Sequence, residues 1–315
     1  MTAQLHREFG RPWSAGDPIA SIGIPVFNGE AFLATAIESA LSQNFEDYEI
    51  IISDNCSVDS TEQICRAYAH AHTRISYQRQ NENIGGQGNF NYLAARARGR
   101  FITWLAHDDV LEPDFLRRTV EYLLDHPLAV ASTGDILWID AKGNEIRTDL
   151  LVSIRHGIPW SRRRLEFFKY PMSNAFFCVY ALMRTDVGRK VTFGLREPKV
   201  ASGSELPFLS RLALEGEIAS LPCVLRRYRE HGSSGFKAEQ ARLAKRSRIR
   251  RALFLWKHIN HLRLGQAQVL IAADLPVVVK VHAFASLFLF YLRLIAGRVY
   301  RVVARLLLRA SGRAR

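Results

Sequence analysis

The stretch from Phe101 to Pro113, FITWLAHDDVLEP, constrains the fold of this chain more than any other. Its first five residues are apolar, aromatic or β-branched at nearly every position, which is typical of a strand covered on both faces. Asp108 and Asp109 follow where such a strand leaves the sheet, the point at which open α/β sheets bind ligands. The stretch therefore predicts a buried strand with an acidic ligand site at its end. A solvated turn that caps the next helix is the alternative.

Strand and helix patterns alternate at short spacing on either side of this stretch. Residues 19–26, 48–53 and 75–79 have strand patterns, whereas 30–43, the segment from Ser60, and 114–126 have helical ones. The glycine-rich segment 81–89 predicts a loop before a further helix that runs to Arg98. This alternation predicts an α/β fold with a mostly parallel central sheet flanked by helices on both faces.

The second half of the chain is less regular. Residues 129–133, 136–139 and 176–183 have strand patterns, and 218–228 predicts two short strands broken at Pro222. Residues 205–215 form a helical pattern that Gly216 ends. The pattern is helical from residue 237 onward. We therefore expect a helical C-terminal extension beyond the sheet domain.

Composition is typical of a globular protein in a reducing compartment. With 315 residues and 48% hydrophobic content, the chain is long enough to bury a full core. Its first seventeen residues contain no apolar run, which predicts that there is no secretory signal. The four cysteines show no paired or metal-ligand spacing, as expected of reduced thiols in the cytoplasm.

The net charge of +13 is concentrated near the C-terminus. Residues 236–315 contain 17 Lys and Arg against 2 Asp and Glu, whereas residues 1–235 contain 26 against 28. A nucleic-acid enzyme usually has its basic surface beside the active site, so this distribution argues against a nucleic-acid partner. A basic segment that is also rich in Leu, Val and Phe is instead typical of contact with an anionic membrane.

The segment 277–308 predicts a basic amphipathic helix. Its longest run without a charged residue is 281–292, twelve residues, which is shorter than the roughly 20 needed to span a bilayer. Arginines then recur at helical spacing, at positions 298, 301, 305 and 309. We expect this helix to lie on the inner face of the cell membrane and to attach a cytoplasmic protein peripherally. Packing onto the sheet domain, an oligomer contact and a spanning helix are the alternatives.

Acidic residues follow three separate elements of the predicted fold. Asp54 ends the second strand, Asp108 and Asp109 follow the strand at 101–105, and Glu205 begins a helix. Parallel strands bring the first two sets to one edge of the sheet. A carboxylate for ribose hydroxyls, a cation-binding acid and a proton acceptor together suit transfer from a nucleotide-linked donor. Taken singly, each acid is also explained as a helix cap.

Six segments resemble, in order and spacing, motifs of the family 2 glycosyltransferases, which have the GT-A fold. They are PVFNGE (25–30), ISDNCSVDST (52–61), NENIGGQGN (81–89), WLAHDDVLEP (104–113), SELPFLSRLALEG (204–216) and YREHGSS (228–234). The resemblance implies a GT-A domain at residues 18–235, with 236–315 as the basic extension. It also implies a nucleotide-diphosphate sugar as donor, whose sugar passes to an acceptor hydroxyl with inversion at the anomeric carbon.

The resemblance implies roles for individual residues. Those implied to bind the nucleotide sugar are Pro25, Phe27, Asn28, Glu30, Asp54, Asn83, Asp108 and His231. The first three are similar to the wall of the nucleotide site, with Glu30 nearby, and Asp54 is similar to the acid that holds the base and ribose. His231 is similar to a histidine that closes over the diphosphate. A histidine that ties down the last strand is the alternative.

Asp108 and Asp109 are the expected ligands of a divalent cation, Mg²⁺ or Mn²⁺. Asp108 resembles the metal-contacting acid of the DxD motif, but Ala106 stands where the first acid of that motif commonly falls. Magnesium is held by one or two carboxylates together with substrate phosphates, so the loss of one acid weakens the site without abolishing it. We therefore expect metal-assisted transfer.

Glu205 is the expected general base. It lies where the family places an Asp that takes the proton of the acceptor hydroxyl, and its side chain is one methylene longer. That proton becomes acidic as the new carbon–oxygen bond forms, so a well-placed carboxylate of ordinary basicity is sufficient.

The expected acceptor is a saccharide or a lipid-linked molecule, as the family often uses in surface polysaccharide or glycolipid synthesis.

Two other functions fit parts of the sequence. A sugar-nucleotide-binding module without catalysis would explain Ala106 and Glu205. A sugar-phosphate nucleotidyltransferase has a similar core, but such enzymes carry a glycine-rich loop with Arg and Lys after the first strand, and PVFNGE has neither Arg nor Lys.

Overall fold

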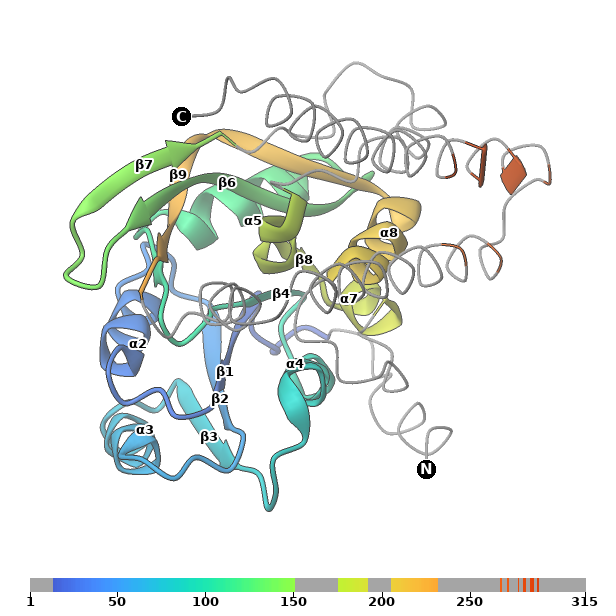
Figure 1. Ribbon diagram of the computed structural model, residues 1–315. Coiled ribbons are helices and arrows are strands. Elements are labelled where there is room, and N and C mark those ends of the chain that lie inside the picture. Colours follow the sequence, from blue (N-terminus) through green and yellow to red (C-terminus); the bar gives the residue numbers. More distant parts are fainter. Residues whose placement is uncertain are drawn as a thin grey trace, which may run out of the picture.

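A nine-stranded sheet with helices on both faces organises the molecule (Figure 1). The computed structural model describes residues 14–150, 175–191 and 205–231, together with single helical positions between 267 and 288. The predicted extension, 236–315, otherwise lies outside the described residues. Among the helices that the structure describes, none combines the length and apolar content of a membrane span.

The first four predicted strands are present within one residue of their expected bounds. The strands are β1 (Ala20–Val26), β2 (Tyr48–Asp54), β3 (Ile75–Arg79), β4 (Phe101–Trp104), β5 (Val110–Leu111), β6 (Ala129–Ile139), β7 (Glu145–Asp149), β8 (Leu182–Arg184) and β9 (Glu217–Arg229). The helices are α2 (Leu33–Leu41), α3 (Thr61–Ala71), α4 (Gly85–Arg96), α5 (Phe115–Asp125), α7 (Thr185–Lys190) and α8 (Glu205–Glu215), with a 3₁₀ helix η1 (Ala175–Tyr180).

The first four strands form the parallel half of the sheet, in the spatial order β3, β2, β1, β4. β1, β2 and β4 are buried along their whole length, as expected of strands covered on both faces. β8 pairs antiparallel with both β4 and β6, and β6 pairs in parallel with β9. β6 therefore runs in the same direction as β4, and the expected mostly parallel α/β sheet is confirmed.

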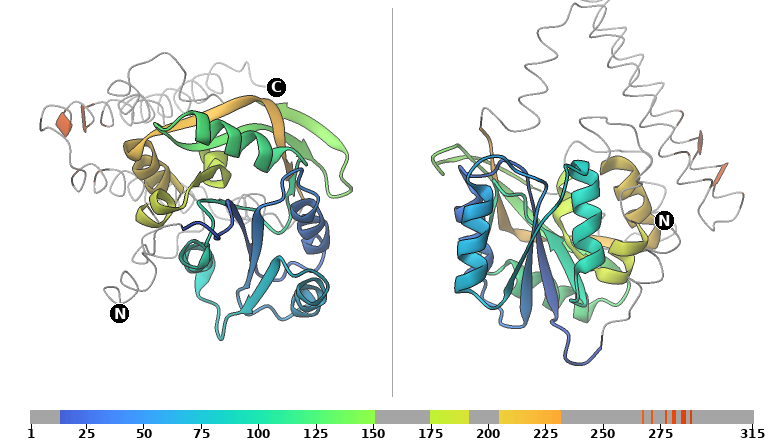
Figure 2. Two further views of the ribbon diagram at one scale, coloured as in Figure 1. Left: turned by 180° about the vertical axis from the view of Figure 1, so that it is seen from behind. Right: turned by 90° about the horizontal axis from the view of Figure 1, so that it is seen from below.

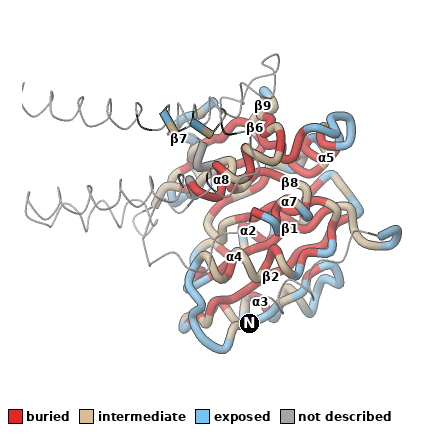
Figure 3. Tube along the Cα trace, turned by 90° about the vertical axis from the view of Figure 1, so that its right-hand side faces the viewer, coloured by how far each residue is buried: buried red, intermediate tan, exposed pale blue. Residues whose placement is uncertain are grey.

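Two helical layers enclose the sheet, as Figure 2 shows. One hydrophobic cluster packs α2, α3 and α5 against one face, with Leu33 and Phe115 among its fully buried side chains. The other cluster packs α4 and α8 against the opposite face through Leu93 and Phe208. Buried residues accordingly follow the strands and the inner sides of the helices (Figure 3).

The glycine-rich segment 81–89 is not a loop throughout, contrary to the sequence prediction. Helix α4 begins inside it, at Gly85, which has φ +78°. The Asn83 side chain accepts from the Gly85 N–H (2.9 Å), and the Asn55 side chain accepts from the Ile84 N–H (2.9 Å). Because these side chains satisfy amides at the helix start, a helix forms where glycine alone predicts a loop.

The predicted strand at 176–183 is also wrong for most of its length, since the 3₁₀ helix η1 precedes the short strand β8. The Tyr180 carbonyl oxygen accepts from Thr103 Oγ1 (2.9 Å) and from Arg226 Nη2 (2.9 Å), so side chains replace a strand partner there. An apolar run of this length does not distinguish a strand from a buried helical turn.

The two pairs of short strands predicted at 129–139 and 218–228 are each one continuous strand. The pairing of β6 with β9 shifts register between Gly134 and Asp135, where the partner changes from Leu221 to Val224. The irregularity leaves Pro222, which cannot donate to a ladder, outside the pairing. A bulge in a long strand therefore replaces the predicted break.

Candidate active site

The carboxyl ends of β1, β2 and β4 lie at one edge of the sheet, called here the carboxyl edge. Val26, the last residue of β1, is paired with Asp54, the last residue of β2. β4 runs parallel to β1 on its other side and ends at Trp104. The loop that follows, which contains the acid pair Asp108 and Asp109, therefore leaves the sheet on the same side as Asp54. The expectation that these acids share one edge is confirmed.

Asn28 joins the loop after β1 to the loop after β2. It has φ +50°, a left-handed conformation that Asn tolerates. Its backbone N–H donates to Ser57 Oγ (2.9 Å), and its side-chain Oδ1 accepts from the Val58 N–H (3.0 Å). Phe27 is 44% exposed, whereas Pro25 is buried within β1. Of the predicted nucleotide wall, Phe27 and Asn28 thus face solvent.

Glu30 and Asp59 hold the same two loops together. The Glu30 N–H donates to Asp59 Oδ2 (3.1 Å), and Glu30 Oε2 accepts from the Ser60 N–H (3.0 Å). Asp59 Oδ1 accepts from the N–H of Thr61, the first residue of α3 (3.0 Å). Both carboxylates therefore bind amides at the start of α3, where the helix dipole favours negative charge.

Asp54 is fully buried at the end of β2. Its Oδ1 accepts from the Ser57 N–H (2.9 Å), and its Oδ2 accepts from the Tyr77 hydroxyl (3.2 Å) and Arg79 Nη1 (3.3 Å). Burial, and then the charge of Asp54, raises the pKa of Tyr77, so its hydroxyl stays a donor. Asp54 thus braces β2 against β3, and its contact with a base and ribose stays a prediction.

Asn83 contacts the residue that follows Asp54. Its Oδ1 accepts from Asn55 Nδ2 (3.0 Å). Asn55 is 3% exposed, and its backbone N–H donates to the Val26 carbonyl oxygen (2.8 Å). Asn83 therefore lies at the carboxyl edge together with the other residues expected to bind the nucleotide.

Asp108 and His231 are in direct contact although 123 positions separate them. Asp108 Oδ2 lies 2.9 Å from His231 Nε2, and the two side chains are 19% and 9% exposed. The His231 ring also packs against Phe32, with ring centroids 4.8 Å apart. The contact with Asp108 agrees with a role of His231 at the diphosphate, and the contact with Phe32 agrees with a role in anchoring the chain after β9. The structure therefore contains a contact for each of the two interpretations.

Asp109 is only 1% exposed. Its Oδ1 accepts from the Arg229 N–H (3.0 Å), whereas its Oδ2 has no hydrogen-bond partner among the described residues. Burial, and then the charge of Asp108, raises the pKa of the Asp109 carboxyl to about 8. The charges of Arg226 and Arg229 oppose this shift. The acid pair therefore combines one accessible carboxylate with one that is buried.

Two arginines of β9 support the acid pair. Arg226 is 2% exposed, and its Nη2 donates to the carbonyl oxygens of Trp104 (3.0 Å) and Tyr180 (2.9 Å). Arg229 is 5% exposed, and its Nε donates to the Asp108 carbonyl oxygen (2.9 Å). The protein thus places two guanidinium groups next to the acid pair.

Neither arginine was predicted from the sequence to lie at the site. The run RRYREH at 226–231 has the composition of a solvated charged face, so nothing local indicates that two of its arginines are buried. The segment YREHGSS, which includes Arg229, was the one signal that could have pointed to it.

Helix α8 begins at the carboxyl edge. The residue that follows its last turn, Gly216, lies against Leu128 and Val130 at the amino end of β6. Since β6 runs in the direction of β4, this end of α8 lies at the amino edge of the sheet. A helix of 11 residues spans about 16 Å, so its first residue lies toward the opposite, carboxyl edge.

Glu205 is that first residue, and the structure places it by its backbone alone. One turn later, Phe208 packs on Trp104 at the end of β4, with ring centroids 5.8 Å apart. The backbone of Glu205 therefore lies toward the carboxyl edge of the sheet, where Asp54 and Asp108 also lie. Its role as a base stays a prediction.

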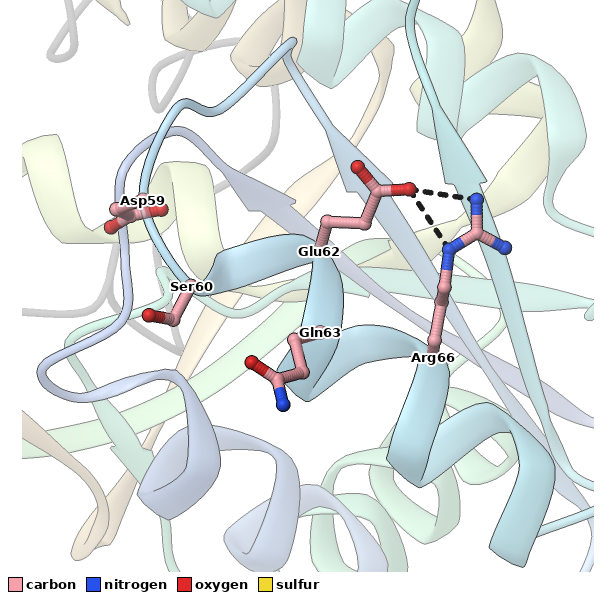
Figure 4. A pocket seen from close by; sticks show the side chains of 5 residues that line it. All are labelled: Asp59, Ser60, Glu62, Gln63 and Arg66. Carbon is pink, nitrogen blue, oxygen red and sulfur yellow. Dashed lines mark hydrogen bonds and ion pairs between the residues drawn. The ribbon is translucent and has the colours of Figure 1, made fainter.

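A pocket of about 580 Å³ lies beside the first turn of α3 (Figure 4). Its lining residues are Asp59, Ser60, Glu62, Gln63 and Arg66. Glu62 and Arg66 point toward each other and form an ion pair (2.7 Å). None of the residues expected to bind the donor lines it, so this pocket is not the site predicted from the sequence.

The acid pair offers the oxygen ligands that Mg²⁺ and Mn²⁺ prefer. Within the described residues, no group of three or more His, Cys, Asp or Glu gathers as a metal centre. Asp109 Oδ2 is a buried oxygen without a hydrogen-bond partner in the described part. These donors fit a cation whose remaining ligands are substrate phosphates and water.

Comparison with curated proteins finds relatives that are named as glycosyltransferases or, in one case, as a synthase. The chain is 31% identical to an uncharacterized glycosyltransferase of Rickettsia typhi over 157 residues (49% of this chain, 46% of the relative). It is 31% identical to the putative teichuronic acid biosynthesis glycosyltransferase TuaG of Bacillus subtilis over 117 residues (37% and 46%). It is 32% identical to chondroitin synthase of Escherichia coli over 184 residues (57% and 24%). The chain thus spans less than half the length of these relatives.

Solved structures with the same fold include S. aureus TarS in complex with UDP-GlcNAc, with a TM-score of 0.60 at 16% identity, covering 85% of this chain and 71% of that one. They also include the mannosyltransferase PcManGT of Pyrobaculum calidifontis in complex with GDP-Man and Mn²⁺, with a TM-score of 0.55 at 14% identity, covering 97% and 86%. Residues 21–190, just over half of the chain, match the family described as Glycosyl transferase family 2. The chain therefore belongs to the family 2 glycosyltransferases and has their GT-A fold.

Proposed function

We propose that this enzyme transfers a sugar from a nucleotide-diphosphate sugar to an acceptor hydroxyl, with inversion at the anomeric carbon. One observation supports this most: Asp54, the acid pair and the backbone of the first residue of α8 all lie toward the carboxyl edge of the sheet, though they are far apart in the sequence. TarS and PcManGT, which share the fold, were solved with UDP-GlcNAc and with GDP-Man.

Glu205 is the proposed general base. In a single inverting displacement, the acceptor oxygen forms the new bond to the anomeric carbon as the bond to the diphosphate breaks, and Glu205 takes the hydroxyl proton. A carboxylate can do so at ordinary basicity because the proton becomes acidic in the transition state. The position of Glu205 at the start of α8 supports this assignment.

Asp108 and Asp109 are the proposed holders of Mg²⁺ or Mn²⁺. Asp108 has the more accessible carboxylate of the two, and PcManGT was solved with Mn²⁺. A bound cation would offset the negative charge that develops on the departing nucleoside diphosphate. His231, 2.9 Å from Asp108, is proposed to donate a hydrogen bond to that diphosphate once the donor is bound.

We further propose that the acceptor is a saccharide or a lipid-linked molecule of a surface polysaccharide or glycolipid. TuaG and chondroitin synthase, two of the relatives, are named for polysaccharide synthesis. The basic amphipathic segment 277–308 supports attachment to the inner face of the cell membrane. Deletion of 277–315 is expected to move the protein from the membrane to the soluble fraction, and unchanged partitioning would contradict this.

The test of the transfer reaction is Glu205→Gln. We expect the rate of sugar transfer or donor hydrolysis to fall about 10²–10⁴-fold, because the proton acceptor is lost. Binding of UDP and GDP, measured by calorimetry with Mn²⁺, should stay within about twofold, since Glu205 acts on the acceptor. Glu215→Gln at the other end of α8 is the control, because Glu215 pairs with Lys190 at the surface.

The products separate the alternatives. A transferase releases a nucleoside diphosphate, whereas a nucleotidyltransferase releases pyrophosphate. A module without catalysis would bind nucleotide sugars but turn over none of a donor panel in the wild-type chain. Full activity in Glu205→Gln would mean that the base is another residue.

A further inference from the structure

Arg229, at the end of β9, contacts both members of the acid pair. Its backbone N–H donates to Asp109 Oδ1 (3.0 Å), and its side-chain Nε donates to the Asp108 carbonyl oxygen (2.9 Å). Its Nη1 donates to the carbonyl oxygens of Asp140 (3.1 Å) and Ala141 (3.3 Å), in the turn between β6 and β7. One residue therefore joins the carboxylate of one acid, the backbone of the other and a distant turn.

The same guanidinium reaches the loop that is expected to bind the nucleotide. Its carbon lies 4.8 Å from the centroid of the Phe32 ring, which directly precedes α2. That ring also contacts His231, whose Nε2 lies 2.9 Å from Asp108. Contacts between Arg229, Phe32, His231 and Asp108 thus connect the loops after β1 and β4 with the end of β9.

The chemistry of this residue fits the task better than that of a neutral side chain. Burial of a charge costs free energy, and a neutral donor would bind the carbonyl oxygens of Asp108, Asp140 and Ala141 at a lower desolvation cost. Hydrogen bonding to these oxygens therefore does not by itself explain why the residue is charged. A guanidinium supplies planar donors in a fixed fork and a permanent positive charge beside two carboxylates. A lysine would keep the charge but lose the fork.

We propose that Arg229 is a positioning residue that sets the acid pair for binding of a divalent cation together with the nucleoside diphosphate. This role rests on the proposed function. Arg229 acts through Asp108 and Asp109 and through the Phe32 contact. Replacement of Arg229 by lysine keeps the charge and removes the fork, so it tests whether the fork is required.

The experiment compares Arg229→Lys with the wild-type chain. The measured quantity is the Mn²⁺ concentration that gives half-maximal binding of UDP or GDP in calorimetry. We expect it to rise at least about tenfold in the variant, as for other residues that orient metal ligands. Nucleotide binding without Mn²⁺ should change less than about twofold. Arg227→Lys is the matched control, because Arg227 lies on the same strand, is 39% exposed and pairs with Glu112.

A second variant, Phe32→Leu, removes the ring beneath the guanidinium. We expect it to raise the Mn²⁺ requirement about threefold, in line with the strength of a cation–π contact. If Arg229→Lys does not fold, the Mn²⁺ requirement of Phe32→Leu tests the role of Arg229 in its place.

An unchanged Mn²⁺ requirement in whichever of the two variants folds, or an equal loss of nucleotide binding with and without Mn²⁺, would overturn the role of Arg229. Failure of the wild-type chain to bind either nucleotide would overturn the proposed function instead, and the positioning role with it.

Discussion

The two halves of the carboxyl edge differ in how completely their polar groups are paired. Asn28 and Glu30, in the loop after β1, bind backbone amides of the loop after β2, and Asp54 binds the Ser57 amide in its own loop. In the acid half, Asp109 Oδ2 and Arg226 Nη1 are buried without a hydrogen-bond partner in the described part of the chain. Buried polar groups are rarely left so, since each costs free energy. The first half is therefore preformed, and the second retains polar atoms that a ligand can satisfy.

A large effect on stability that does not depend on pH is expected where the two halves touch. A Cβ on Gly29 would lie 2.6 Å from Val26 Cγ2 and 2.8 Å from His107 Cδ2. We expect Gly29→Ala to destabilise the protein by about 1–3 kcal/mol through overpacking. In the control Gly86→Ala the new methyl meets nothing within 4 Å, and better helix propensity should stabilise by about 0.5–1 kcal/mol. Urea denaturation measures both, and equal shifts would refute the tight contact.

A second effect on stability is expected from the buried acid, and it depends on pH. The pKa of Asp109 in the folded state is raised to about 8 by burial and then by Asp108. The folded state therefore binds more protons than the unfolded state, whose pKa is near 3.9, so the stability contributed by this group falls as pH rises from about 4 to about 8. Asp109→Asn should raise the melting temperature relative to wild type, by an amount that grows over this range.

Asp114→Asn provides the control of opposite sign. The hydrogen bond from Arg117, and then that from Asn44, lowers the pKa of Asp114. Its contribution to stability is present above the unfolded pKa and is lost as pH falls through the folded one, so this variant should be the less stable protein at neutral pH. A difference between Asp109→Asn and wild type that stays constant from pH 5 to pH 8 would mean that Asp109 is not buried as a neutral acid.

The smallest effect is expected in the preformed half. Glu30→Gln keeps an oxygen that can accept from the Ser60 N–H but removes the charge at the start of α3. We expect a loss of about 0.5 kcal/mol, because the charge interacts with the helix dipole near solvent. High salt should abolish the difference. A loss that persists at high salt would show that the hydrogen bond itself, and not the charge, holds the loop.

The sequence predicted the parallel half of the sheet well because its signals are local. Buried strands such as 101–104 are continuous apolar runs, and the acids follow directly after them. Prediction failed where a partner distant in sequence decides the conformation. The start of α4 depends on the side chain of Asn55, and η1 depends on Thr103 and Arg226.

The sequence by itself determined the order of strands and helices, the acids at the strand ends and the family of the chain. Each of these can be recognised from residues that are adjacent in the sequence. Only the tertiary structure decided that Arg226 and Arg229 lie buried behind the acid pair and that His231 meets Asp108. These contacts form because β9 pairs with β5 and β6 across about a hundred residues. The periodicity of a single segment does not predict such a pairing, since the pairing depends on which distant strands share hydrogen bonds.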